Sequence, residues 1–391
     1  LYIKILRFML VIVGSWPRKE IGEPEPKYQA VFLKYFYLGT ISLGMVGAIT
    51  YIIKHLGELS FLEIGHMYIM ILMTSVNLCY LTKNTQWLFQ VLFQTHKMVH
   101  LLSHLFTLCL LVQMLLGLSL FNLIPMYSNY AAGRYKSGGL KNSTFEHSLY
   151  YSYPFNISTD MRGYIVACIL HWFVSYLTST WFVMFDLLLS LMVFNIWGHF
   201  KILMNLLNEF PIPSSEFTIE NGFVIKLEKY TTEELLKISE RLKECIIYHR
   251  EIVKFTDTMS DAFGPMLFVY YMFHQASGCL LLLECSQMVT LMRYLPLTIV
   301  LTQQLIQLSV IFELVGSESG KLKDAVYGVP WEYMDIKNRR VVIIFLMNVQ
   351  EPVHVKALGV ANVGVNSMAM VSSTVSAIKR EATTWQLEIA R

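Results

Sequence analysis

The residues that could carry out chemistry are sparse in this chain and are spread through apolar sequence. It contains no Ser/His/Asp set, no glycine-rich nucleotide loop and no HExxH motif, so we expect no enzyme activity, no cofactor and no metal centre. Asn142 and Asn156 each begin an N-x-S/T tripeptide, the acceptor sequence for N-glycosylation. Both tripeptides lie in the polar stretch 127–162 between two apolar runs, which favours an extracellular or luminal loop.

Ionisable side chains within apolar runs are a second kind of candidate, because a charge is costly inside a membrane. Asp186, Glu284 and Glu313 lie deepest in their runs. The sequence leaves two explanations open, a structural pair inside a helix bundle or a role in moving ions or protons, and it favours the first. His66 and His171 are expected to be hydrogen-bonded packing residues rather than ligand contacts.

Bulky and adaptable side chains are a third kind of candidate. Aromatic residues and methionines are dense in the predicted outer halves of the runs, and apolar walls with few polar groups suit a small hydrophobic ligand. Ordinary bundle core is the alternative for any one of these residues. Those that we predict to bind a ligand are Met70, Trp172, Phe173, Tyr176 and Met288.

Small and hydroxylated residues crowd the last apolar run. Ser372, Ser373 and Ser376 could offer oxygen atoms to water and ions, and we predict that they line a pore. Close packing against other membrane helices would explain the same small residues, and the spacing alone does not separate the two.

These side chains must be positioned by membrane helices surrounded by lipid. Of the 391 residues, 54% are hydrophobic and 15% are charged, whereas soluble domains carry about 25% charged residues. The net charge of +3 gives no sign of nucleic-acid binding. Because a membrane helix needs roughly 20 apolar residues, we predict an all-α, polytopic membrane protein with seven transmembrane helices. The seven runs are about 31–53, 61–81, 101–126, 163–195, 263–294, 296–315 and 355–378.

Basic residues favour one orientation of these helices. Lys and Arg are concentrated in the segments that are cytoplasmic if the amino terminus is inside the cell. The glycosylation tripeptides agree, so we predict a cytoplasmic amino terminus and an extracellular carboxyl terminus at the plasma membrane. The stretches 196–262 and 317–354 would then extend into the cytoplasm. Thr231 and Glu234 resemble a capping box that starts one amphipathic helix, and a second helix is predicted from about Pro330.

One stretch near the carboxyl terminus resembles a known family. Residues 324–335 read DAVYGVPWEYMD, 337–340 read KNRR, and 343–347 read IIFLM. This sequence closely resembles the C-terminal signature of insect odorant receptors. Residues 360–378 look like the seventh helix of that family, and Gly-Ser-Trp-Pro at 14–17 is similar to moth members, including sex-pheromone receptors.

The resemblance implies the tuning subunit of a ligand-gated, nonselective cation channel in olfactory neurons. Such a subunit would assemble with a dedicated co-receptor into a heterotetramer. Volatile hydrophobic odorants would bind in the outer half of the subunit, the outer half of the seventh helix would line the pore, and the cytoplasmic ends of the fourth to seventh helices would join the subunits. On this basis Tyr333, Asp335 and Arg340 are expected to support assembly.

A G-protein-coupled receptor and a gustatory chemoreceptor are the alternatives. The first lacks support because a DRY-like triplet and an NPxxY motif are missing and the predicted orientation is reversed. The sequence of residues 324–350 favours an odorant receptor over a gustatory receptor. The polar tail 379–391 departs from the aromatic-rich end of the family's last helix, and it would alter the outer mouth of a pore.

Overall fold

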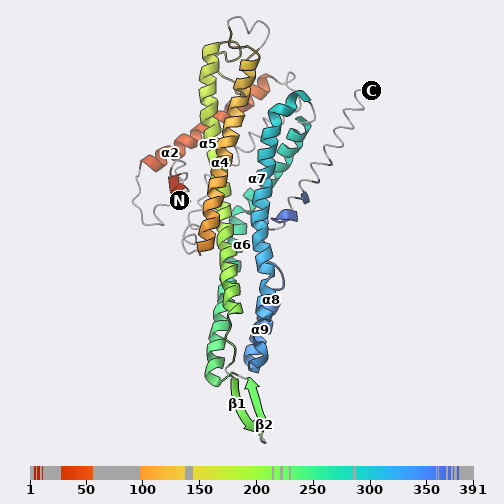
Figure 1. The fold of residues 1–391 in the computed structure, drawn as a ribbon. Helices are drawn as coiled ribbons and strands as arrows, with labels where there is room; N and C mark the ends of the chain where they lie inside the picture. The colour runs from red at the N-terminus through yellow and green to blue at the C-terminus, as the bar shows by residue number, and fades with distance from the viewer. Residues whose placement is uncertain are drawn as a thin grey trace.

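Long helices dominate the computed structural model (Figure 1). They are α2 (Gln29–Lys54), α4 (Lys97–Ala131), α5 (Met161–Asn208), α6 (Thr232–Glu284) and α7 (Met288–Gly320). Shorter elements follow, namely α8 (Leu322–Tyr327), the 3-10 turn η2 (Trp331–Tyr333) and α9 (Ile336–Asn348). The structure describes residues 4–5, 7–8, 11, 28–55, 97–136, 144–213, 215–220, 223–228, 230–284, 288–357, 359, 361–366, 369–370, 373 and 377.

Two small hairpins interrupt this helical architecture. Strands β1 (Ser215–Glu220) and β2 (Phe223–Glu228) pair antiparallel between α5 and α6. Strands β3 (Lys356–Ala357) and β4 (Ala361–Asn362) form a second antiparallel pair after α9. We call the end of the bundle that carries β1 and β2 the hairpin end, and the opposite end, which carries residues 144–160, the loop end (Figure 1).

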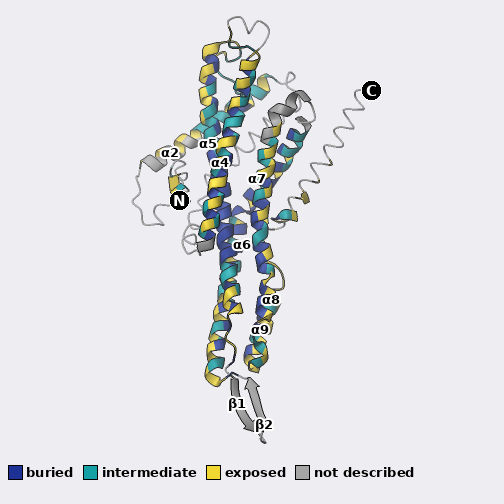
Figure 2. Cartoon of the chain, viewed as in Figure 1, coloured by how far each residue is buried: buried dark blue, intermediate teal, exposed yellow. Residues whose placement is uncertain are grey.

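Three helices in the described part of the chain are long and apolar enough to cross a membrane. They cover Val99–Ala131, Met161–Asn208 and Thr298–Tyr333. The most apolar stretch of α5 is 88% buried against 28% for that of α4, so α5 is surrounded by protein whereas α4 turns a broad face outward. Figure 2 shows the same contrast, with dark blue concentrated in the middle of the bundle.

The exposed face of α4 has the spacing of a lipid-facing helix. Leu101, Leu105, Leu108, Val112 and Leu115 recur every three or four residues, and each is more than half exposed. The buried face of α5 instead meets α4, α6 and α7 with large apolar side chains. Its best-buried members include Leu187, Leu189, Leu191, Met192, Ile196, Phe200 and Leu203.

Several predicted boundaries are wrong. The last run was expected to be helical from residue 355, but 356–357 and 361–362 form strands, and described helical residues begin at Val365. A break between the fifth and sixth runs at 295 is also wrong, because α7 already begins at Met288. Apolar composition marks which residues enter a membrane, but hydrogen bonding of the backbone decides where each helix starts.

The segment predicted as one helix from Pro330 is divided. Trp331–Tyr333 form a 3-10 turn, and α9 begins at Ile336 after Asp335, whose side chain accepts a hydrogen bond from the Asn338 amide at 3.3 Å. A carboxylate in that position satisfies a free amide of the first helical turn, so it sets the start of the helix.

The predicted capping box is confirmed at the start of α6. The Thr231 hydroxyl accepts from the Glu234 amide at 3.3 Å, and the Glu234 carboxylate accepts from the Thr231 amide at 2.8 Å. From this cap α6 continues without a break through the predicted amphipathic helix and into the fifth apolar run.

A close helix crossing joins α4 to α5. Gly198 lies so near Val99 that a Cβ atom at 198 would be 2.6 Å from Cγ2 of Val99, which is 2% exposed. Valine has few rotamers in a helix, so its side chain has little freedom to move aside. Glycine at 198 therefore sets how closely the two helices approach.

We predict that Gly198→Ala lowers stability by about 1–3 kcal/mol, because the added methyl overpacks this contact. Thermal unfolding of the detergent-purified protein would report the loss. Val99→Ala should restore part of the stability in the double variant, since it removes the clashing methyl groups. Equal unfolding temperatures for Gly198→Ala and the wild type would show that the crossing relaxes freely.

Candidate ligand site at the loop end

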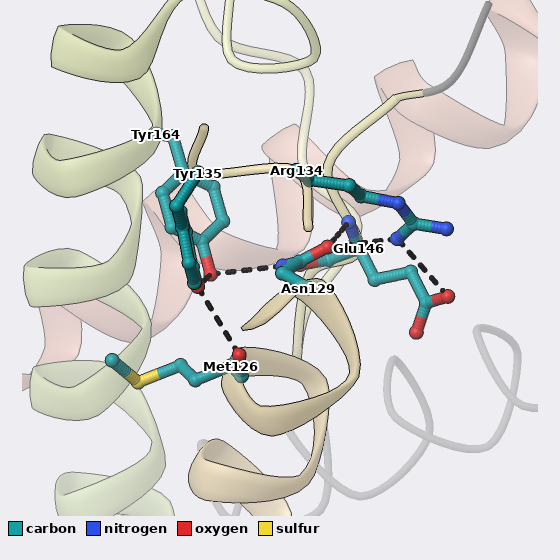
Figure 3. A network of polar contacts seen from close by, with 6 residues as sticks. All are labelled: Met126, Asn129, Arg134, Tyr135, Glu146 and Tyr164. Atoms are coloured by element: carbon teal, nitrogen blue, oxygen red, sulfur yellow. Dashed lines mark hydrogen bonds and ion pairs between the residues drawn. The ribbon is translucent and has the colours of Figure 1, made fainter. Parts of the chain in front are cut away.

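The loop end is held together by one buried amide side chain (Figure 3). Asn129, near the end of α4, donates from Nδ2 to the Glu146 carbonyl at 2.8 Å and to the Tyr164 hydroxyl at 3.0 Å. Its Oδ1 accepts from the Glu146 amide at 2.9 Å and from Arg134 at 2.8 Å. All four hydrogen-bonding positions of the amide are used, so Asn129 joins α4, the loop and α5.

A second set of contacts supports this junction. Arg134 forms an ion pair with Glu146 at 3.2 Å. The Tyr135 hydroxyl lies 2.9 Å from that of Tyr164 and donates to the Met126 carbonyl at 3.2 Å. In Figure 3, Tyr135 and Tyr164 lie on one side of Asn129, and Arg134 and Glu146 lie on the other.

The loop also lies against α2. The Ser152 amide donates to the Gly47 carbonyl at 3.3 Å, and Lys54 donates to the Ser152 hydroxyl at 2.9 Å. The ring of Tyr151 packs over Gly44 and Gly47, where a Cβ atom would already be in van der Waals contact with it. Burial raises the pKa of the Tyr151 hydroxyl to about 12, so this side chain is neutral at physiological pH.

His171 of α5 lies directly beneath the loop. It is 1% exposed, and its ring centroid is 5.6 Å from that of His147, 6.2 Å from Tyr151 and 6.0 Å from Tyr153. Within the described part of the chain, neither of its ring nitrogens has a hydrogen-bond partner. His171 is buried as predicted, but the predicted hydrogen bond is absent from the described residues, which reopens a role as a ligand contact.

Ser175, one turn further along α5, is also a buried polar residue without a described partner. It is 7% exposed, and its hydroxyl also has no partner among the described residues. Residues four apart share one face of a helix, so His171 and Ser175 lie one turn apart on the same face of α5. Neither side chain has a described hydrogen-bond partner. A buried polar group without a partner is costly, which makes such a pair a candidate for binding a ligand atom.

The residues predicted from bulk and position lie beside this pair. Trp172 is half-buried, Phe173 is 41% exposed and meets the ring of Phe36 on α2 at 6.4 Å, and Tyr176 packs against the core. Met70 lies outside the described residues, and so does the side chain of Met288 at the start of α7. The structure therefore places three of these five side chains, all on α5.

A deeper polar cluster lies between α5 and α6. Asp186 is 4% exposed and lies beside Tyr270, whose ring centroid is 4.4 Å from that of His274. In the described residues, Oδ1 of Asp186 and Nε2 of His274 have no hydrogen-bond partner. The neighbouring Tyr271 hydroxyl reaches Ser309 of α7 at 3.1 Å. Among the described residues Asp186 makes no ion pair, and the polar side chains around it are themselves buried in the bundle.

The structure describes only some of the residues predicted for the pore, for assembly and for glycosylation. Ser372 and Ser376 lie outside the described residues, while Ser373 is helical, exposed and donates to the Met370 carbonyl at 2.9 Å. Tyr333 is half-buried against the core, and Arg340 is exposed on α9. The glycosylation residue Asn156 is exposed, whereas Asn142 lies outside the described residues.

Comparison with known proteins decides the family. The family model for the seven-transmembrane odorant receptors matches residues 94–377. The chain belongs to the insect odorant receptor family. This is a family of ligand-gated cation channels and not of enzymes, so the receptor is a multi-pass membrane protein of that class.

Solved structures show the same fold for this receptor. The insect olfactory receptor OR5 from Machilis hrabei superposes with a TM-score of 0.73 at 14% identity, with 97% of each chain covered. The structure of that receptor in complex with eugenol gives 0.70 at 14% identity, covering 98% of this chain and 97% of the other. No curated protein matches the chain significantly.

Sequence reasoning missed the residues that organise the loop end. Asn129, Tyr151 and Ser175 carry no motif, and their roles depend on contacts between distant segments of the receptor. The only available signal was the spacing of His171 and Ser175, two polar residues four apart within an apolar run.

We predict that Asn129→Ala destabilises the receptor by more than about 2 kcal/mol, because it removes four hydrogen bonds that a buried side chain makes between α4, the loop and α5. Thermal unfolding would measure the loss, and limited proteolysis should cut faster within 144–160. Asn208→Ala, at an exposed position near the hairpin end, is the control. Unchanged cleavage in the Asn129 variant would mean that other contacts hold the loop.

Proposed function

We propose that this receptor is the odorant-binding subunit of a channel that opens when a small volatile molecule binds at the loop end. The unpaired polar atoms of His171 and Ser175 carry the proposal, because they are buried beside aromatic rings and have no described partner. A ligand with an apolar body and one oxygen-bearing group would satisfy one of them and bury its remaining surface. Such a molecule matches a site that is mostly apolar with few polar groups.

The walls of this site are the residues predicted from the sequence. Trp172 and Tyr176 flank the His171–Ser175 face of α5, and Phe173 reaches toward α2. Met70 and Met288 complete the proposed walls from the second and fifth runs. The Machilis hrabei receptor with the same fold has been solved with eugenol, a small aromatic molecule that carries a hydroxyl group. That ligand has the chemistry expected here.

The ligands that we propose for this receptor are a narrower chemical group than odorants in general. The similarity of residues 14–17 to moth members points to long-chain alcohols, aldehydes and acetates, the chemistry of moth pheromones. Each combines an extended apolar chain with a single oxygen-bearing group. A histidine can donate to a carbonyl or accept from a hydroxyl, so His171 suits all three classes.

The orientation and the channel roles form part of the same proposal. An extracellular loop end is supported by the exposed Asn156 within its glycosylation tripeptide. Ser372, Ser373 and Ser376 would line the pore in the complete channel. The hairpin end would then face the cytoplasm, as the distribution of Lys and Arg favours.

Assembly with a co-receptor is supported by apolar side chains at the hairpin end. Ile336, Ile343, Ile344 and Met347 on α9 are each more than half exposed, as is Tyr327 on α8. If this end is in water, such a patch requires a partner surface. Asp335 and Arg340 lie at the same place and border a shallow, open depression with Ile336 and Lys337. We propose that they and Tyr333 join the receptor to the co-receptor.

The ligand test compares 1-octanol, octanal, octyl acetate and octane on cells that express the receptor with and without the co-receptor. We expect currents only with the co-receptor and only for the three oxygen-bearing compounds. His171→Phe keeps an aromatic ring but removes both nitrogens, and should weaken potency about 3- to 10-fold, the effect of one hydrogen bond. Currents from octane equal to those from octanol would contradict the proposed polar contact.

The matched control places the same new side chain on the other face of α5. Ile169 is 64% exposed, so Ile169→Phe should leave the dose response unchanged. Unaltered potency for His171→Phe and for Ala variants of Trp172 and Tyr176 would place the ligand elsewhere.

The assembly test substitutes alanine at Tyr333, Asp335 and Arg340. We expect each variant to lower the amount of receptor that co-purifies with the co-receptor from the cell surface, and to reduce the current for every ligand alike. Lys237→Ala, an exposed position on α6, is the control. A changed ligand ranking with normal assembly would assign these residues to ligand choice.

A further inference from the structure

The segment that joins α9 to the last helical residues is held by two buried serines. The Ser319 hydroxyl on α7 accepts from the Val353 amide at 2.9 Å, and the Ser260 hydroxyl on α6 accepts from the Lys356 amide at 3.1 Å. Ser319 is 3% exposed and Ser260 is 7% exposed. The Val363 amide then donates to the Val355 carbonyl at 2.9 Å, which closes the β3–β4 hairpin. These hydrogen bonds anchor the segment to α6 and α7.

A third contact holds the residue at which described helix resumes. Oε2 of Glu313 on α7 accepts from the Val365 amide at 3.1 Å. Residues 365 and 366 are helical, so the carboxylate lies at the first turn of the last helix. An anion there is favoured by the free amides and by the positive end of the helix dipole. A hydrogen bond to a charged acceptor is also stronger than a neutral one.

Gly364 makes this contact possible. A Cβ atom at 364 would be 2.6 Å from Oε2 of Glu313, which is too close for any other residue without movement of the carboxylate. Among the described ion pairs none includes Glu313. The partner of this carboxylate in the described chain is thus the backbone of the last helix.

We propose that Glu313 is a positioning residue that couples α7 to the channel helix beginning at Val365. This inference rests on the proposed channel function. The helix α7 starts at the loop end, where the ligand would bind, and packs along α5 and α6. A displacement of α7 on ligand binding is passed to the channel helix through the Glu313–Val365 contact. Ser319 and Ser260 hold the preceding segment, so the motion is delivered at the first turn.

The experiment breaks the contact from both sides in the complex with the co-receptor. Glu313→Ala removes the acceptor, and Gly364→Ala pushes the carboxylate away. Each should lower the maximal current evoked by the most potent of 1-octanol, octanal and octyl acetate about 5- to 10-fold per surface complex, the effect expected of a charged cap. The double variant should be no worse than either single one, because both remove the same interaction.

Two further measurements separate coupling from folding. Glu313→Gln keeps an oxygen acceptor without the charge, so it should lose less current than Glu313→Ala at equal surface expression. A synthetic agonist of the co-receptor should open complexes that contain any of the variants as well as it opens the wild type. Glu351→Ala removes an exposed carboxylate from the same region and should change nothing.

The possible failures are distinct. Full odorant current in Glu313→Ala, or a double variant whose loss is the product of the two single losses, would overturn the coupling role. Equal loss of the co-receptor agonist's current would show a general folding defect and would overturn it as well. If the wild type responds only to that agonist, the proposed odorant function fails. Ligand-free current then tests the coupling, and an equal reduction in Glu313→Ala and Gly364→Ala is the supporting result.

Discussion

The burial of the middle of α5 is the constraint on which the rest of the structure depends. A helix in a membrane satisfies its own backbone, so its position is decided by side-chain packing. The middle of α5 is almost wholly buried, and the helix touches α2, α4, α6, α7 and α8. The contact of Gly198 with Val99 sets the distance to α4, and the hydrogen bond between His199 and Tyr248 at 2.7 Å joins α5 to α6.

The two ends of the bundle differ in their chemistry. At the loop end, Asn129 uses its complete hydrogen-bonding capacity to hold a folded loop, while His171 beneath it has no described partner. At the hairpin end, Arg241 donates to the carbonyls of Leu206 and Glu209 at the end of α5, and apolar side chains of α8 and α9 remain exposed. These differences are the basis for the ligand site proposed at one end and the subunit contact proposed at the other.

The helix α7 can link the ligand site proposed at the loop end to the segment before the last helix. The helix α7 starts near the loop end and carries Glu313 and Ser319 to the segment before the last helix. Glycine recurs where this segment meets α7, because Gly364 admits the Glu313 carboxylate and Gly316 admits the ring of His354. Close contacts of this kind transmit displacement, since a packed interface has little free space to absorb it.

The sequence by itself determined the membrane class, the helical architecture, the family and the cap of α6. Those features depend on local composition, on the sequence of residues 324–350 and on residues only three apart, such as Thr231 and Glu234. Tertiary structure alone decided which polar side chains are satisfied. Asn129 and His171 look equally ordinary in sequence, yet the side chain of one makes four hydrogen bonds and that of the other has none described, because partners come from segments brought together by packing. For the same reason Glu313, predicted only as a buried acid, became the cap of another helix.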